Sequence, residues 1–461
     1  MSLIDDKWKL LFDRYEIEKK VSESGPFCIT ADQIREYKEP RLMTKFDTRE
    51  SLPSVFGNRL GILPVTRGSY VIGEFDLYAD FPEAGDGAGG IRAAKVKKAA
   101  IPDYYETIDI NDIRSEAGAI NVMGISGILD DFLGGEGFKQ TVSGRMASGN
   151  FSFQVNPVKS SSKAGLSAGT GLSASKAGLA AGTGTTEGTG GKTGGWQLTV
   201  NNSQVEIDGG FEDRDTFAVI EGKNVVHSNF LVRQLYYPYR LWSGKLAKPV
   251  RPVFMVYSNN IFRLMEYEFT DPLCYNSIRL IKEGQYSLED TDISAADLRD
   301  AWERTAVKPE PQVTFIQADS FEKVISLVEH LNEGPLTPAE IAEVFGFRER
   351  QSDYYFNACR YLGLAVKEKD EDRTVRVTIT SQGKKLLKLN YKARQIRYVE
   401  LILEHGIFHD LFETVMRRGE IPDKKYIEKK ILEQNLCSSN VAGRRASSVS
   451  GWLKWMAGLV Q

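Results

Sequence analysis

Hydrophobic and polar residues follow two different periods along the chain, one typical of strands and the other typical of helices. Alternating segments rich in β-branched and aromatic residues predict strands at 61–81, 150–154, 196–200, 204–208, 216–220 and 250–269. Apolar residues at three- and four-residue spacing predict helices at 5–20, 108–133, 229–237, 321–331 and 350–362, and a helical segment at 391–461. Because strands and helices intermingle, we expect an α/β (α+β) fold in which helices flank a mixed sheet.

Residues that begin or end helices sharpen these boundaries. Thr30 and Thr337 each stand three residues before Gln or Glu, a capping-box pattern, and Pro338 suits the first position of a helix. Pro238 lacks the N–H that a helix interior needs, so it predicts the end of the helix that begins near residue 229.

The segment 204–224 predicts a β-hairpin with an acidic turn, and three of its side chains carry candidate chemistry. Asp208 ends the first predicted strand, and Glu221 and Lys223 lie two residues apart at the end of the second, so both point to one face. Two carboxylates can hold Mg²⁺, and a lysine beside the metal can position and deprotonate a water. We interpret Asp208 and Glu221 as metal ligands and Lys223 as the water-activating residue.

A plainer interpretation of the hairpin stays open. Acidic residues at hairpin ends are often solvated turn residues, and an E-x-K triplet is common by chance. Glu116 lies in the first turn of the helix at 108–133, where the helix dipole alone favours an acid. Glu206 would take the place of Asp208 if the register of the first strand slipped.

Residues 160–195 form a low-complexity segment. Eleven of these 36 residues are glycine, and KAGLSAGTG at residue 163 recurs as KAGLAAGTG at residue 176. Such a segment cannot bury enough apolar surface to offset the entropy of ordering, so we expect a flexible insertion in a hairpin loop. Its GGKT resembles the end of a P-loop, but a P-loop would need glycine at position 186, where the chain has Thr186. This difference argues against nucleotide binding.

Composition and charge describe an ordinary globular chain with a basic end. The 461 residues, 41% hydrophobic and 26% charged, predict two or three domains. The net charge is −3, but residues 384–461 hold 15 Lys and Arg against 8 Asp and Glu, which suits a polyanionic partner. Four dispersed cysteines, and the absence of a signal sequence or a membrane-spanning apolar run, predict reduced thiols in a cytoplasmic protein with no membrane contact.

The C-terminal third shows the element order of a winged helix. Three helices over 321–362 precede two strands with a charged turn at 365–380 and a further helix. The third helix of a winged helix normally enters the major groove, so we expect DNA contacts from Arg348, Arg350, Gln351, Ser352 and Arg360. A winged helix can also serve dimerisation or packing alone.

Two other basic groups are candidates for DNA contacts. The loop at 38–53 interleaves basic, apolar and hydroxyl residues, which suits phosphate contacts from Arg41, Lys45 and Arg49. In the segment at 391–461, we expect a second helix-turn-helix-like unit that presents Arg444 and Arg445, with Asn440 as a helix cap. The His405 and His409 pair lacks a third ligand, so we interpret both as surface residues.

These motifs resemble a known enzyme family. The order Asp208, then E-G-K at 221, then FLVRQLYYPYR, PVFMVYS and RLMEYEF is similar to type II restriction endonucleases of the PD-(D/E)XK nuclease superfamily, over roughly residues 35–280, with Ile207 in place of the proline. The resemblance implies Mg²⁺-dependent cleavage of double-stranded DNA, a supporting polar role for Gln234, a homodimer, and a cognate DNA methyltransferase encoded nearby. It also implies that the helix before the hairpin supplies a further acid to the metal site, and Glu116 is the candidate.

We therefore expect a PD-(D/E)XK endonuclease domain at 1–315 that includes the insertion, a winged-helix domain at 316–390, and a basic helix-turn-helix-like domain at 391–461. Two other functions stay open. One is a structure-specific repair or recombination nuclease of the same fold, and the other is a winged-helix DNA-binding regulator without catalysis. The regulator would have no use for Asp208, Glu221 and Lys223 together.

Overall fold

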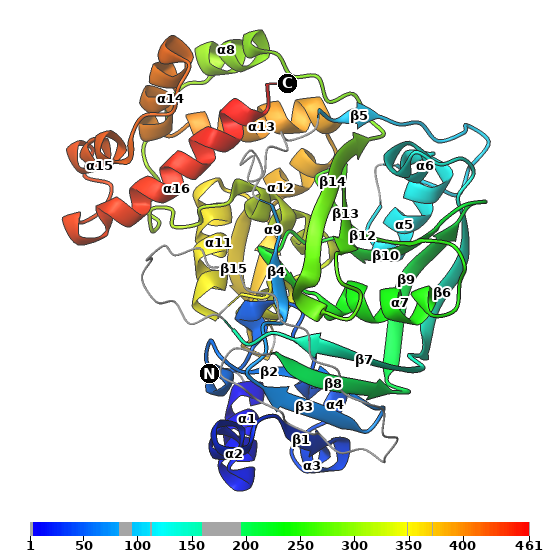
Figure 1. Cartoon of the computed structure of the whole chain (residues 1–461). Helices are drawn as coiled ribbons and strands as arrows, with labels where there is room; N and C mark the ends of the chain where they lie inside the picture. Colours follow the sequence, from blue (N-terminus) through cyan, green and yellow to red (C-terminus); the bar gives the residue numbers. More distant parts are fainter. Residues whose placement is uncertain are drawn as a thin grey trace, which may run out of the picture.

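A seven-stranded mixed sheet lies at the centre of the structure, a computed structural model that describes residues 3–82, 95–110, 113–158, 195–347, 349–370 and 372–460 (Figure 1). β10 runs parallel to β12, and β14 runs parallel to β5, whereas the other neighbours are antiparallel. The strand order is β5 (Lys97–Lys98), β14 (Ile278–Ser287), β13 (Ile261–Phe269), β12 (Val250–Ser258), β10 (Phe217–Lys223), β9 (Gln204–Glu212) and β6 (Lys139–Ala147). The fold is therefore a mixed α+β architecture, as the sequence predicts.

Helices cover both faces of this sheet because its central strands are apolar on both sides. Ala218 and Ile220 of β10 belong to the core formed with the α5 and α6 helices, whereas Phe217 and Val219 belong to the core formed with α7. Strands buried on both faces read as continuous apolar runs, as this one does. The covering helices are α5 (Glu116–Ile125), α6 (Ile128–Leu133) and α7 (Arg233–Ser243).

An N-terminal unit packs around its own aromatic core. Trp8, Phe12 and Phe56 meet edge to face at its centre, with ring centroids 4.9–6.2 Å apart. Its three-stranded sheet, in the order β1, β3, β2, carries four helices. The elements are α1 (Leu3–Tyr15), α2 (Ile17–Ser24), β1 (Phe27–Thr30), α3 (Ala31–Arg35), α4 (Pro40–Met43), β2 (Gly61–Pro64) and β3 (Ser69–Gly73).

Two small ladders join this unit to the central sheet region. One is β4 (Tyr78–Asp80) with β11 (Asn229–Leu231), and the other is β7 (Asn150–Val155) with β8 (Trp196–Asn201). The low-complexity segment connects β7 to β8, which agrees with an insertion in a hairpin, and residues 160–194 lie outside the described residues.

The C-terminal region is mainly helical and packs around one hydrophobic cluster that draws buried side chains from both 316–390 and 391–461. The predicted order of three helices, two strands and a helix is present. The elements are α8 (Ala295–Arg304), α9 (Phe321–Glu333), α10 (Pro338–Phe345), α11 (Glu349–Tyr361), β15 (Ala365–Lys369), β16 (Val375–Ile379), α12 (Ser381–Leu387), α13 (Tyr391–Leu403), α14 (Gly406–Arg418), α15 (Lys424–Glu433) and α16 (Ser439–Gly458).

Several predicted helix boundaries are wrong for reasons visible in the structure. Pro238 lies inside α7, where Tyr236 and Tyr237 are fully buried and hold the helix against the sheet. Packing of this kind offsets the hydrogen bond that the proline removes. The predicted helix at 108–133 is two helices, because Gly127 adopts φ +71° between α5 and α6. Ser438, not Asn440, is the cap residue of α16.

Three predicted strand segments differ in place or in number from a simple central sheet. The strands at 61–81 and 196–200 belong to the smaller sheet and ladders, not to the central sheet. The segment 250–269 is a hairpin, because Asn259 and Asn260 both adopt positive φ and turn the chain between β12 and β13. Among the described helices, none is both long enough and apolar enough to cross a membrane.

Candidate functional site

The centre of the candidate site lies on two adjacent antiparallel strands, β9 and β10. Ile220 pairs with Gly209, so the same register sets Glu221 beside Asp208. An Asp208 carboxylate oxygen accepts a hydrogen bond of 3.0 Å from the Gly222 backbone N–H. Asp208 lies within β9 and not at its end as predicted, because the strand continues to residue 212. The two predicted metal ligands are thus neighbours across a strand pair.

Glu221 is held by two side-chain donors. The Lys223 Nζ donates to Glu221 Oε1 at 2.7 Å and to the Gly222 carbonyl at 3.0 Å, and Gln234 Nε2 of α7 donates to the same Glu221 oxygen. Glu221 is only 7% exposed, so these donors stabilise a carboxylate that has little water around it. The Gln234 Oε1 atom is buried and makes no hydrogen bond within the described residues.

Glu116 approaches this pair from the opposite helix layer. Ser115 caps α5 by accepting a 3.0 Å hydrogen bond from the Gly118 N–H, which fixes Glu116 in the first turn. The Glu116 Oε1 atom lies 3.9 Å from Lys223 Nζ. The helix therefore brings a second carboxylate close to the lysine.

The pKa values of the cluster reflect burial together with crowded negative charge. Burial raises the pKa of Glu221 to about 8, and Asp208 adds to this effect while Lys223 opposes it. Burial likewise raises the pKa of Glu116. Burial lowers the pKa of Lys223, but the charges of Glu221 and Glu116 outweigh it and raise that pKa above its ordinary value. The buried carboxylates are therefore short of compensating positive charge.

The oxygen atoms of the cluster fit a hard divalent cation. Asp208, Glu221 and the unpaired Gln234 Oε1 supply oxygen donors, the ligand type that Mg²⁺ prefers. Among the described residues, no group of three or more His, Cys, Asp or Glu side chains is arranged as a metal site. Mg²⁺ keeps several of its waters, so two or three protein oxygens are enough to hold it.

The end of α10 in the C-terminal region contacts two segments that flank the site. The ring Nδ1 of His227 lies 3.1 Å from the Phe345 carbonyl oxygen at the end of α10. A carbonyl only accepts, so Nδ1 carries the proton. Burial lowers the pKa of His227 to about 4, and the ring is neutral at pH 7. The Thr48 hydroxyl donates to the next carbonyl, that of Gly346, at 3.4 Å.

The predicted DNA-contact residues differ in how far their side chains are exposed to solvent. Those with exposed side chains are Arg41, Lys45, Arg49, Arg350, Arg360 and Arg444. Arg49 forms an ion pair with Asp80 at 2.9 Å. Ser352 is only 1% exposed, so its hydroxyl faces the protein interior and not a DNA groove, while Gln351 and Arg445 are half-buried. Arg348 lies outside the described residues.

The interpretation of His405 as a surface residue is wrong. It is 7% exposed, its ring stacks on Tyr361 with centroids 3.7 Å apart, and its Nδ1 lies 3.3 Å from a Glu310 carboxylate oxygen. His409 is half-buried and stacks on Trp302. Packing with aromatic partners from distant segments explains both positions.

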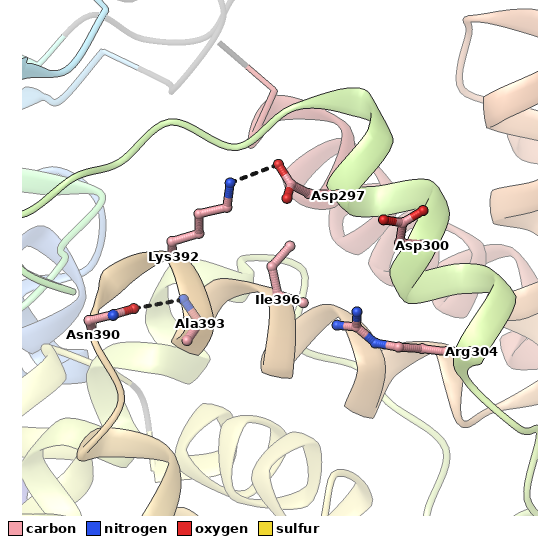
Figure 2. A pocket seen from close by; sticks show the side chains of 7 residues that line it. All are labelled: Asp297, Asp300, Arg304, Asn390, Lys392, Ala393 and Ile396. Carbon is pink, nitrogen blue, oxygen red and sulfur yellow. Dashed lines mark hydrogen bonds and ion pairs between the residues drawn. The ribbon is translucent and has the colours of Figure 1, made fainter.

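A pocket of about 350 Å³ lies between α8 and α13, away from the acidic cluster (Figure 2). Lys392 and Asp297 form an ion pair of 2.9 Å across it, and Asn390 accepts from the Ala393 N–H as the cap of α13. These side chains satisfy one another, and none of the candidate site residues lines the pocket.

Sequence reasoning missed Asp47. The charge of Asp47 acts on Glu116, Glu221, Lys223 and His227. Asp47 is thus near the cluster in space, although it precedes Glu116 by more than sixty residues in the sequence. The flanking basic residues drew attention to this loop as a phosphate-contact segment. Only the packing of the N-terminal unit against β11 brings the acid to the site.

Comparisons with known families match three consecutive regions. Residues 5–72 match a domain of unknown function (DUF6996), residues 73–168 and 188–287 match a second (DUF6997), and residues 323–461 match a third (DUF7226). No curated protein and no solved structure matches the chain. The carboxylates and the lysine on the sheet and on α5 thus come from the second region, and Asp47 comes from the first.

Proposed function

We propose that this protein is a Mg²⁺-dependent endonuclease that hydrolyses phosphodiester bonds of double-stranded DNA at a specific sequence, as type II restriction enzymes of the PD-(D/E)XK superfamily do. One observation carries the proposal: Glu221 is buried, bonded to Lys223 and Gln234, and beside Asp208. Burying ionisable groups is costly unless they are paired or bind a cation. A DNA-binding regulator would have no use for such a cluster.

The negative charge of the cluster supports a divalent cation. Among the principal electrostatic neighbours of Glu221, Asp208 and Asp47 are negative and Lys223 is positive. When bound, Mg²⁺ would neutralise these carboxylates, polarise a phosphate oxygen and lower the pKa of a bound water. Asp208 and Glu221 would hold it, with Gln234 as a further oxygen donor.

Lys223 acts in the proposed reaction as a held cation. The negative charge of Glu221 and Glu116 raises the pKa of Lys223, so Lys223 is protonated whenever Glu221 is ionised. In this state it can orient a phosphate oxygen and neutralise charge there. Accepting a proton from water would first require it to lose its own. Gln234 orients Glu221 through the amide hydrogen bond from α7.

Exposed basic residues supply the proposed DNA contacts. Lys45 acts electrostatically on Glu116, which puts a cation at the rim of the cluster. Arg350 and Arg360 lie exposed on α11, the third helix of the winged-helix-like order, where major-groove contacts would be made. Cutting both strands needs two active sites, so we propose a homodimer that acts beside a cognate DNA methyltransferase.

One experiment tests this function. Purified protein is incubated with unmethylated plasmid DNA and Mg²⁺, in parallel with Lys223→Ala and with Lys248→Ala as a matched control. Lys248 pairs with Glu212 at 2.6 Å on the same sheet but outside the cluster. Discrete fragments from the wild type and Lys248→Ala alone support the proposal. Equal cleavage by Lys223→Ala, or no cleavage by the wild type, refutes it.

The products also separate the two nuclease functions. A restriction enzyme gives fixed fragments whose pattern depends on sequence, and it leaves uncut the DNA that its cognate methyltransferase has modified. A structure-specific repair nuclease instead cuts branched or end-containing substrates without fixed fragments from the plasmid.

A further inference from the structure

The loop at 45–50 is held by hydrogen bonds against β11, the short strand that follows β10. The Leu231 N–H donates to the Asp47 carbonyl at 2.9 Å, and the Arg49 N–H donates to the Asn229 side-chain oxygen at 2.7 Å. The Asn229 amide in turn donates to both oxygens of Glu50, at 3.1 and 2.9 Å. Asn229 is 1% exposed, so these bonds are shielded from water. The backbone of Asp47 is therefore held in place by β11.

The loop that holds Asp47 lies beside the acidic cluster, because Leu231, whose N–H binds the Asp47 carbonyl, stands three residues before Gln234, the donor to Glu221. The charge of the Asp47 carboxylate reaches this cluster. It acts on Glu221, Lys223, Glu116 and His227, which come from a strand, the loop after it and a helix of the opposite layer. The residue is half-buried, and within the described residues its carboxylate makes no hydrogen bond or ion pair. Glu221 and Asp208, by contrast, each accept from a protein donor. Asp47 is thus an acceptor without a donor at the site.

Resting on the proposed function, we propose that Asp47 is a further positioning residue of the metal site, which accepts hydrogen bonds from the waters bound to Mg²⁺. Among the described residues, no three acids are arranged as a ready-made ligand set, so we assign Asp47 to the waters around the cation and not to the cation itself. Mg²⁺ retains several waters, and each of these donates two hydrogen bonds that need acceptors. A fixed, unpartnered carboxylate beside the ligands is such an acceptor.

This assignment makes the site composite. Asp208, Glu221, Glu116 and Gln234 come from the region matched at 73–287, whereas Asp47 comes from the region matched at 5–72. The N-terminal unit would therefore belong to the metal site itself, and its loop would set how the hydrated cation sits over Glu221.

The test measures Mn²⁺ affinity by calorimetry on the full chain, without DNA. We expect Asp47→Asn to weaken Mn²⁺ binding about 10- to 100-fold, the usual cost of removing an outer hydrogen-bond partner of a metal site. Asp47→Glu, which keeps the charge, should restore most of the affinity. The matched control is Asp80→Asn, because Asp80 pairs with Arg49 at the surface of the same region and should leave binding unchanged. Thermal unfolding of each variant verifies folding.

The outcomes separate this inference from the proposed function. Wild-type affinity in Asp47→Asn, together with weakened binding in Asp208→Asn, overturns the role of Asp47 and leaves the metal site intact. Equal loss in Asp47→Asn and Asp47→Glu also overturns it, because the loss would then follow packing and not charge. Absence of Mn²⁺ binding to the wild type overturns both proposals.

Discussion

Proton competition at Glu221 gives the sharpest prediction from the structure. With a pKa of about 8, Glu221 is mostly protonated at pH 7 in the metal-free protein. A metal needs the carboxylate form, so each binding event should release most of a proton at pH 7. Because protonation of the ligand rises as pH falls, apparent Mn²⁺ affinity should drop on the order of 50-fold from pH 8 to pH 6.

Calorimetry in two buffers of different ionisation enthalpy measures both quantities. Glu221→Gln should lose the proton release, because its amide does not titrate. It should also lose most of the affinity, because the carboxylate ligand is gone. Glu206→Gln is the matched control: Glu206 lies two residues from Asp208, is exposed, and pairs with Arg145 at 3.1 Å. Its variant should behave as the wild type. Equal affinity at pH 6 and pH 8, without proton release, would refute the assignment of Glu221 as a buried, protonated ligand.

Four other changes give direct measurements. Lys223→Met should lower the cleavage rate at least about 100-fold while DNA binding in a gel-shift assay persists, because the cation acts on the reacting phosphate. Gln234→Ala should lower the cleavage rate about 10- to 100-fold by freeing Glu221, with the melting temperature as the control for folding. Arg350→Ala should reduce the slope of log affinity against log salt by about 1 if it contacts a phosphate. Gly346→Ala should destabilise the fold by about 1–3 kcal/mol in denaturant unfolding, because φ is +61° and the added carbon would lie 2.2 Å from the Thr48 hydroxyl. Thr48→Ala should recover part of that loss, and full stability of Gly346→Ala alone would contradict the packing.

Features with local causes were predictable from the sequence. The capping boxes at Thr30 and Thr337 are both present, because each involves only four consecutive residues. The period-two spacing of Glu221 and Lys223 anticipated that they share a face, and their hydrogen bond has that geometry. The start of the helix at Glu116 was not predicted, since the predicted helix began at residue 108.

Features with long-range causes were not predictable from the sequence. Pro238 remains helical only because distant strands bury its aromatic neighbours, which no local pattern reveals. The strands at 150–155 and 196–201 alternate like central strands, yet they pair with each other outside the main sheet. Asp47 reaches the site through backbone bonds to a strand nearly two hundred residues away. The one missed local signal is the Asn259–Asn260 pair, since asparagine tolerates positive φ and often marks a turn.

The contacts of α10 bear on how DNA binding and the acidic cluster would be linked. His227 follows β10 by four residues and binds the Phe345 carbonyl, and Thr48 follows Asp47 and binds the Gly346 carbonyl. α11, the proposed DNA-reading helix, begins at Glu349, shortly after these two carbonyls. Under the proposed function, the end of α10 would therefore contact the segment after the strand that holds Lys223 and the loop that holds Asp47, and it would lie close in the chain to the helix that reads the sequence.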